Sequence, residues 1–147
     1  MVIDLDPASV GLSPATSGAV WGVVMDSVFP TGDWYCLAVL ADGTTSIYTS
    51  GGYGVIGAGQ HESVRAAGHA LLAKAAQQLA LLGPSGGSEL PARGRVALRA
   101  LTFDGQRVLI APENDLGKGK HPASALFYAA QEVLTQVRLI DERQNPA

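Results

Sequence analysis

The chain has 147 residues and a formal net charge of −3; 47% of its residues are hydrophobic and only 16% are charged. This length suits one domain, and the ten basic residues are too dispersed to form the positive face that nucleic-acid binding requires. The sequence has neither a basic, apolar leader nor an apolar run of membrane-spanning length, so we expect a cytoplasmic protein with no membrane partner.

Residues 1–18 are rich in proline, serine, threonine and glycine. This composition predicts an extended N-terminal arm that lies on a neighbouring molecule or on the domain itself. The next segment, 19–29, is rich in β-forming residues and predicts the first strand. A turn is predicted to follow at Pro30-Thr31-Gly32-Asp33.

The following two strands are predicted at 34–40 and 45–49, on either side of Asp42-Gly43. The Asp-Gly pair favours a type I′ hairpin turn, in which both central residues have positive φ. The first part of the chain therefore predicts a three-stranded antiparallel meander. The Val55-Ile56 pair that follows fits either a short strand or an apolar plug within a loop.

A long amphipathic helix is predicted from about His61 to about Leu82. Apolar residues recur there at steps of three and four, which is the period of one helix face. We expect the small residues on this stripe to allow close packing against the sheet or a second helix, and Gly83-Pro84 to end the helix. The stripe comprises Val64, Ala67, Leu71, Ala75, Leu79 and Leu82, with Gly68 and Leu72 on its flank.

The second half repeats the hairpin-then-helix order. Residues 83–94 predict a flexible connector, and strands at 95–103 and 106–110 flank the turn Asp104-Gly105. A second helix is predicted over about 122–139, and the polar tail 141–147 is expected to fray.

These elements predict a single α+β domain over residues 19–140, with the order β-β-β-α-β-β-α. Short connections make neighbouring strands antiparallel, so a five-stranded antiparallel sheet with two helices packed on it is the economical arrangement. The units 34–82 and 95–139 share the phrase G-x-G-x-H before their helices. We therefore expect an internal pseudo-repeat.

The repeated phrase is also the candidate ligand site. Glycine-rich loops before helices can converge backbone N–H groups on a small anion such as a phosphate or carboxylate. The alternative is that the glycines merely turn the chain and the histidines begin the helices. The candidate residues are Gly57, Gly59, His61, Gly117, Lys118, Gly119, Lys120 and His121. If only one copy binds an anion, we expect it to be the second, basic copy.

Other chemistries have weaker patterns. Gly52–Gly57 spells GxGxxG, but the acid that a dinucleotide fold needs about 20 residues later is missing. The histidines at 61, 69 and 121 do not have metal-ligand spacing, and Cys36 lies in an apolar strand typical of a buried thiol. Candidate hydrolase residues exist, without a GxSxG elbow: Ser50, Ser63 or Ser124 with a histidine and Asp42, Asp104 or Asp115. We therefore assign no catalytic residue, metal or cofactor.

Four aromatic residues fall in the predicted strands, where they form either sheet core or a surface for a partner: Trp21, Trp34, Tyr35 and Tyr48. The low charge and the small residues on the helices favour self-association. The leading expectation is a non-enzymatic, homodimeric assembly module. The alternatives are a protein that binds a small anion at the glycine loops, and a small hydrolase.

Overall fold

The structure is a computed structural model that describes residues 20–51, 54–56, 61–85, 90–103 and 105–144, with the backbone alone at 54–56, 85 and 141–144. Its architecture is α+β. The strands are β1 (Val20–Val28), β2 (Trp34–Leu40), β3 (Thr45–Thr49), β4 (Gly54–Ile56), β5 (Gly83–Ser85), β6 (Arg95–Thr102) and β7 (Gly105–Pro112). The helices are α2 (Glu62–Gln77), the 3-10 turn η4 (Leu79–Leu81), α3 (Glu113–Gly117) and α4 (Ser124–Gln144).

The sheet has seven strands in the order β4-β3-β2-β1-β6-β7-β5, and each neighbouring pair is antiparallel. The predicted five-stranded sheet was wrong, because one short strand is added at each edge. β4 contains the Val55-Ile56 pair, while β5 is built from Gly83-Pro84-Ser85, where we expected a connector. Pro84 has no N–H to donate and suits an edge strand. Its pairing with Arg107 of β7 is a long-range contact that the local sequence does not indicate.

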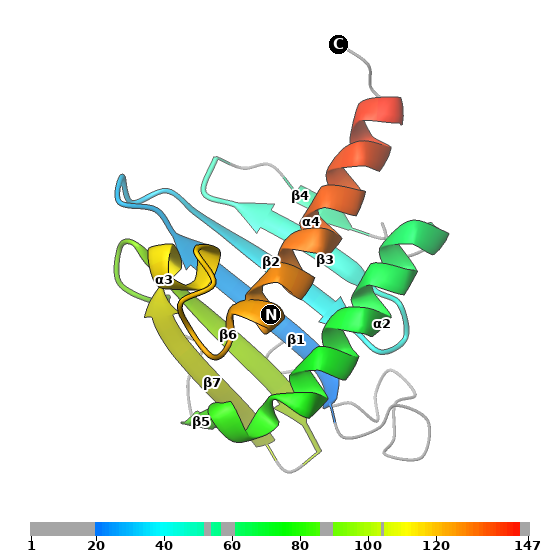
Figure 1. The fold of residues 1–147 in the computed structure, drawn as a ribbon. Coiled ribbons are helices and arrows are strands. Elements are labelled where there is room, and N and C mark those ends of the chain that lie inside the picture. The colour runs from blue at the N-terminus through cyan, green and yellow to red at the C-terminus, as the bar shows by residue number, and fades with distance from the viewer. Residues whose placement is uncertain (1–19, 52–53, 57–60, 86–89, 104, 145–147) are drawn as a thin grey trace.

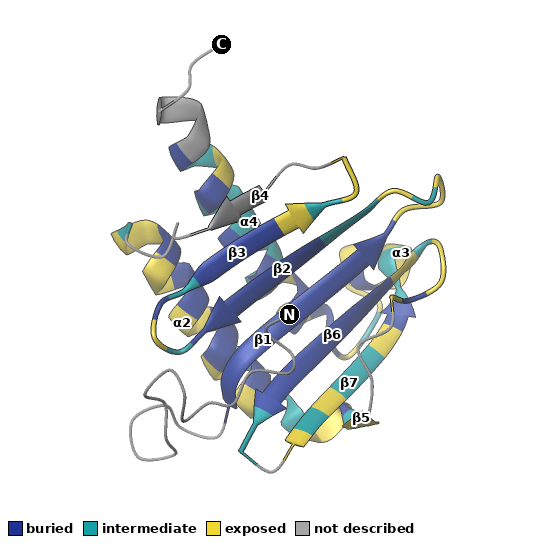
Figure 2. Ribbon diagram, turned by 180° about the vertical axis from the view of Figure 1, so that it is seen from behind, coloured by how far each residue is buried: buried dark blue, intermediate teal, exposed yellow. Residues whose placement is uncertain are grey.

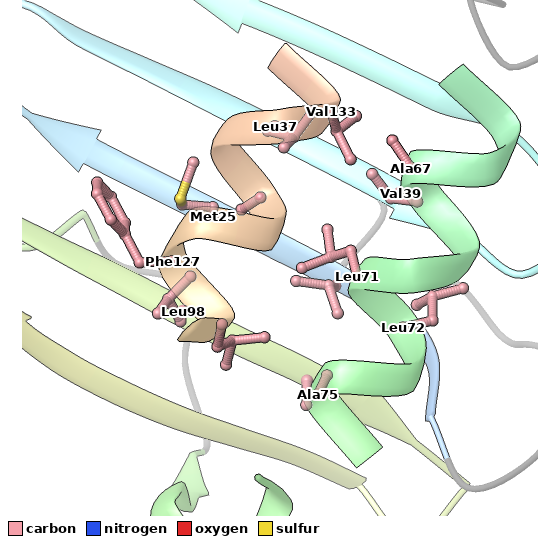
Figure 3. Close-up of a cluster of buried hydrophobic side chains, with 14 of the residues drawn as sticks. Met25, Leu37, Val39, Ala67, Leu71, Leu72, Ala75, Leu98, Phe127 and Val133 are labelled. Atoms are coloured by element: carbon pink, nitrogen blue, oxygen red, sulfur yellow. The ribbon is translucent and has the colours of Figure 1, made fainter. Parts of the chain in front are cut away.

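Helices α2 and α4 lie side by side on one face of the sheet, which we call the first face (Figure 1). Figure 3 shows how Leu71 of α2 and Phe127 of α4 point into the same layer as Met25 and Leu98 from the central strands. Of these four side chains, Leu71, Met25 and Leu98 are fully buried and Phe127 nearly so. The main hydrophobic core therefore lies between the helices and the first face.

The opposite face of the sheet, the second face, is turned toward the viewer in Figure 2. It has a smaller apolar cluster of its own. Among the described residues, no helix lies over it. Because the central strands are apolar on both faces, β2 has a continuous apolar run instead of an alternating one. We call this cluster the second-face cluster; it comprises Trp21, Val24, Cys36, Ala38, Leu40 and Leu101.

The β2–β3 turn is not the predicted type I′ turn. No described residue other than glycine has positive φ, so only Gly43 (φ 97°) adopts the left-handed region here. The Gly43 N–H donates to the Leu40 carbonyl at 3.0 Å, and Asp42 Oδ1 accepts from the Thr44 N–H at 2.9 Å. These contacts describe a type I turn followed by a left-handed glycine, which is another common hairpin connection.

The helix boundaries differ from those predicted. α2 ends at Gln77 and not near Leu82, because Gln78 leaves helical geometry and its Nε2 donates to the Pro122 carbonyl at 3.4 Å. The five-residue α3 was not predicted, since it is too short to show helical periodicity. The backbone at 141–144, which we expected to fray, continues α4. The predicted arm 1–18 and positions 86–89 of the predicted connector lie outside the described residues.

Candidate functional site

The first glycine loop lies largely outside the described residues, which include neither Gly57 nor Gly59. His61 is described, and it is the N-cap residue of α2. Its backbone is extended (φ −84°, ψ 132°) and its side chain makes no capping hydrogen bond. The structure therefore places His61 where the helix begins, as the alternative to a ligand role predicted.

The second glycine loop follows α3 and not a strand. The Lys118 N–H donates to the Asn114 carbonyl at 3.1 Å, and the Lys120 N–H to the Asp115 carbonyl at 3.0 Å. Gly119 has φ 72°, and its N–H donates to a carbonyl of α3 at 3.3 Å. These bonds cap the C-terminus of a helix, where a left-handed glycine is usual. The three N–H groups that would form an anion nest are therefore already bonded to carbonyls.

His121 also has a local structural role. Its Nδ1 accepts from the Ala123 N–H at 3.0 Å, and its own N–H donates to Ser124 Oγ at 3.3 Å. Side-chain acceptors at this point satisfy N–H groups that a helix N-terminus otherwise leaves without partners. His121 and Ser124 together cap α4. The side chains of Lys118 and Lys120, which complete the predicted basic site, are exposed.

The residues considered for hydrolysis or metal binding are not brought together. Ser50 Oγ accepts from the Trp34 N–H at 3.1 Å and donates to Asp33 Oδ1 at 3.5 Å, so it ties a turn to a strand. In the described part of the chain, no serine hydroxyl is hydrogen-bonded to a histidine ring. No group of three histidine, cysteine, aspartate or glutamate residues in that part could hold a metal ion.

The structure contains a buried polar cluster that the sequence did not predict. Asp26 of β1 is fully buried, and its Oδ2 accepts from Arg99 Nη1 of β6 at 2.7 Å. Both side chains point to the second face, because Met25 and Leu98, their neighbours in sequence, point to the first. One signal was present in the sequence: the charged Arg99 interrupts the otherwise apolar run of β6.

Cys36 is the third member of this cluster and lies directly opposite Asp26 in the β1–β2 register. Burial and the neighbouring Asp26 carboxylate raise the pKa of the Cys36 thiol to about 12. The thiol is therefore protonated near neutral pH, when a reactive cysteine would be a thiolate. The cluster has the chemistry of a buried ion pair beside an unreactive thiol.

The pKa of Asp26 predicts how stability depends on pH. Burial raises this pKa above 3.8, against the opposing effects of the Cys36 hydrogen bond and the Arg99 charge. The folded state therefore holds this proton more tightly than the unfolded chain. The stability that the protonated Asp26 carboxyl contributes to the folded state is complete below about pH 3.8 and is lost as pH rises through the raised pKa. We expect wild-type stability relative to Asp26→Asn to fall as pH rises from 4 to 7, measured by urea unfolding; a rise would contradict this assignment.

The aromatic residues divide between core and surface. Trp21 is buried in the second-face cluster, whereas Trp34 is half-buried against that cluster and Tyr48 is 44% exposed. Tyr48 of β3 lies opposite Cys36 of β2, and Cys36 lies two residues after Trp34 on the same strand. Trp34 and Tyr48 are therefore diagonal neighbours on the second face. We call these two residues the aromatic margin.

Tyr35 points the other way. Its hydroxyl accepts from Gln131 Nε2 of α4 at 3.1 Å, and its ring centroid lies 5.8 Å from that of Phe29. It therefore packs within the first-face layer as a core residue. The aromatic margin is the part of the aromatic set that the described helices leave accessible.

No protein-family model, curated protein or solved structure matches this chain. In the part of the chain that the structure describes, none of the helices is both long enough and apolar enough to cross a membrane.

Proposed function

We propose that this chain is a small, non-enzymatic assembly module that forms a homodimer through the aromatic margin. The observation that carries the proposal is the 44% exposure of Tyr48 on the sheet face over which no described helix lies. Trp34 beside it joins that surface to the second-face cluster. Tyrosine and tryptophan anchor protein interfaces because each buries a large area at a small cost in side-chain entropy.

A twofold dimer uses the same surface on both subunits, so the surface has to be complementary to itself. The uncharged aromatic margin meets this requirement without opposing like charges. The small residues of α2 do not contribute to this interface. Ala67, Gly68 and Ala75 are buried in the packing of α2 within a single chain and are unavailable to a second copy.

We also infer that residues 19–140 form one domain. β1 supports this, because it pairs with β2 on one side and with β6 on the other and so joins both hairpins in one sheet. Two separate transitions in the urea unfolding of the wild type would contradict it. The pseudo-repeat stays a prediction, since the second copy of the phrase follows α3 and the first follows β4.

The alternatives have less support. Exposed Lys118 and Lys120 leave some positive charge for an anion, but the neighbouring N–H groups are occupied by carbonyls of α3. A hydrolase would need a nucleophile next to a base. Neither Ser50 nor Ser124 makes that contact with a histidine ring. Anion binding and hydrolysis therefore rank below assembly.

Light scattering after gel filtration tests the dimer. At tens of micromolar we expect a mass of twice the 15.2 kDa of one chain. Association buries the aromatic margin, and a higher protein concentration shifts the equilibrium toward the dimer. Tyr48→Lys places a charge at the interface, and we expect it to return the mass to 15.2 kDa.

Tyr128→Lys is the matched control. Tyr128 is 47% exposed, but it lies on α4 on the other side of the sheet. We expect this variant to remain dimeric. A monomeric wild type would refute the dimer, and dissociation by both variants would refute its location at the aromatic margin.

A further inference from the structure

The centre of the second face is buried although no described helix or strand lies over it (Figure 2). Trp21 is 3% exposed, Leu40 3% and Leu101 1%. A second copy would bury these residues only on association, whereas they are already buried in a single chain. The occupant of this face therefore has to come from the same chain.

We propose that residues 1–18 dock on the second face and cover the second-face cluster. The described chain begins at Val20, in the central strand β1 and at the border of this face. Eighteen extended residues reach up to about 60 Å, whereas the nine residues of β1 span about 30 Å. The segment is long enough to run along the whole face and to return.

The composition of this segment suits the surface it would cover. Leu5, Val10 and Leu12 can pack against the second-face cluster, and the intervening serines and backbone groups are polar. A polar contribution is required, because the buried Trp21 Nε1 has no hydrogen-bond partner among the described residues. A backbone carbonyl or a serine hydroxyl is a suitable acceptor for an indole N–H.

Cys36 provides a direct test. It is the single cysteine of the chain, it belongs to the second-face cluster, and it is buried. Its rate of reaction with a thiol reagent therefore reports how often this face opens. In the full chain carrying Leu5→Ser, Val10→Ser and Leu12→Ser, we expect labelling to accelerate at least about tenfold, because apolar burial on this face is lost.

The control carries Asp4→Asn and Asp6→Asn, which lie in the same segment and are not used in the proposed contacts, and we expect its labelling rate to equal that of the wild type. Circular dichroism establishes that each variant remains folded. If the triple serine variant does not fold, the single variant Leu12→Ser is used instead, and we expect a smaller acceleration of Cys36 labelling.

Unchanged labelling in a folded serine variant would overturn the proposal. So would protection of Cys36 that rises with protein concentration in the Tyr48→Lys background, where the proposed dimer at the aromatic margin is removed, because that dependence would identify a second copy as the cover. The outcome is separate from that of the dimer. Docking of residues 1–18 changes labelling at any concentration, whereas loss of the dimer changes the mass.

Discussion

Asp26→Ala is expected to lower the free energy of unfolding by about 3–5 kcal/mol at pH 7, because it leaves the Arg99 guanidinium buried without this carboxylate. The side chains of the two residues are 0% and 4% exposed, so little water is available to replace the lost partner. Equilibrium urea unfolding of both proteins measures the difference.

A double variant separates the effect of the buried charge from that of packing. Asp26→Leu with Arg99→Met removes both charges and keeps apolar volume on the second face. We expect this double variant to be more stable than Asp26→Ala, because no charge remains buried. A double variant that is less stable than Asp26→Ala would contradict the view that the buried Arg99 charge causes the loss of stability in Asp26→Ala.

Gly68→Leu is expected to destabilise the fold by about 1–3 kcal/mol through overpacking. Even a Cβ at this position of α2 would lie 3.0 Å from Cγ1 of Val39 on β2, which is tighter than most contacts of a Cβ atom and would require the Val39 side chain to shift. The glycine thus lets the helix approach the sheet closely. Thermal and urea unfolding report the loss.

Ala70→Leu provides the control for helix propensity and side-chain size, because Ala70 lies on the same helix and is exposed. We expect its effect to stay within about 0.5 kcal/mol of zero. If the two leucine variants proved equally stable, the close approach of α2 to β2 would not explain why position 68 is glycine.

Local sequence patterns predicted the helices and strands whose formation does not depend on pairing with distant segments. The apolar segments 34–40 and 45–49 are β2 and β3 with the predicted bounds. The stripe through Val64 and Leu71 is the buried face of α2. These predictions succeeded because hydrophobic period and β propensity act over a few neighbouring residues.

The candidate site was less accessible to such reasoning. The Gly117–His121 phrase has the composition of an anion loop, yet its N–H groups bond to α3, a helix too short to be predicted. Asp26 and Arg99 are 73 residues apart in the chain, and only the pairing of β1 with β6 brings them together. Sequence spacing says nothing about such a contact.

The sequence by itself determined the α+β class, the antiparallel hairpins and the apolar faces of both long helices, because each follows from short-range periodicity and turn chemistry. The tertiary structure alone decided the two edge strands, the C-terminal capping role of the second glycine loop, and the burial of an ion pair beside Cys36. Those features depend on which strands become neighbours. That choice is set by packing over the whole chain, since the energy of a contact between distant segments appears only once both are in place.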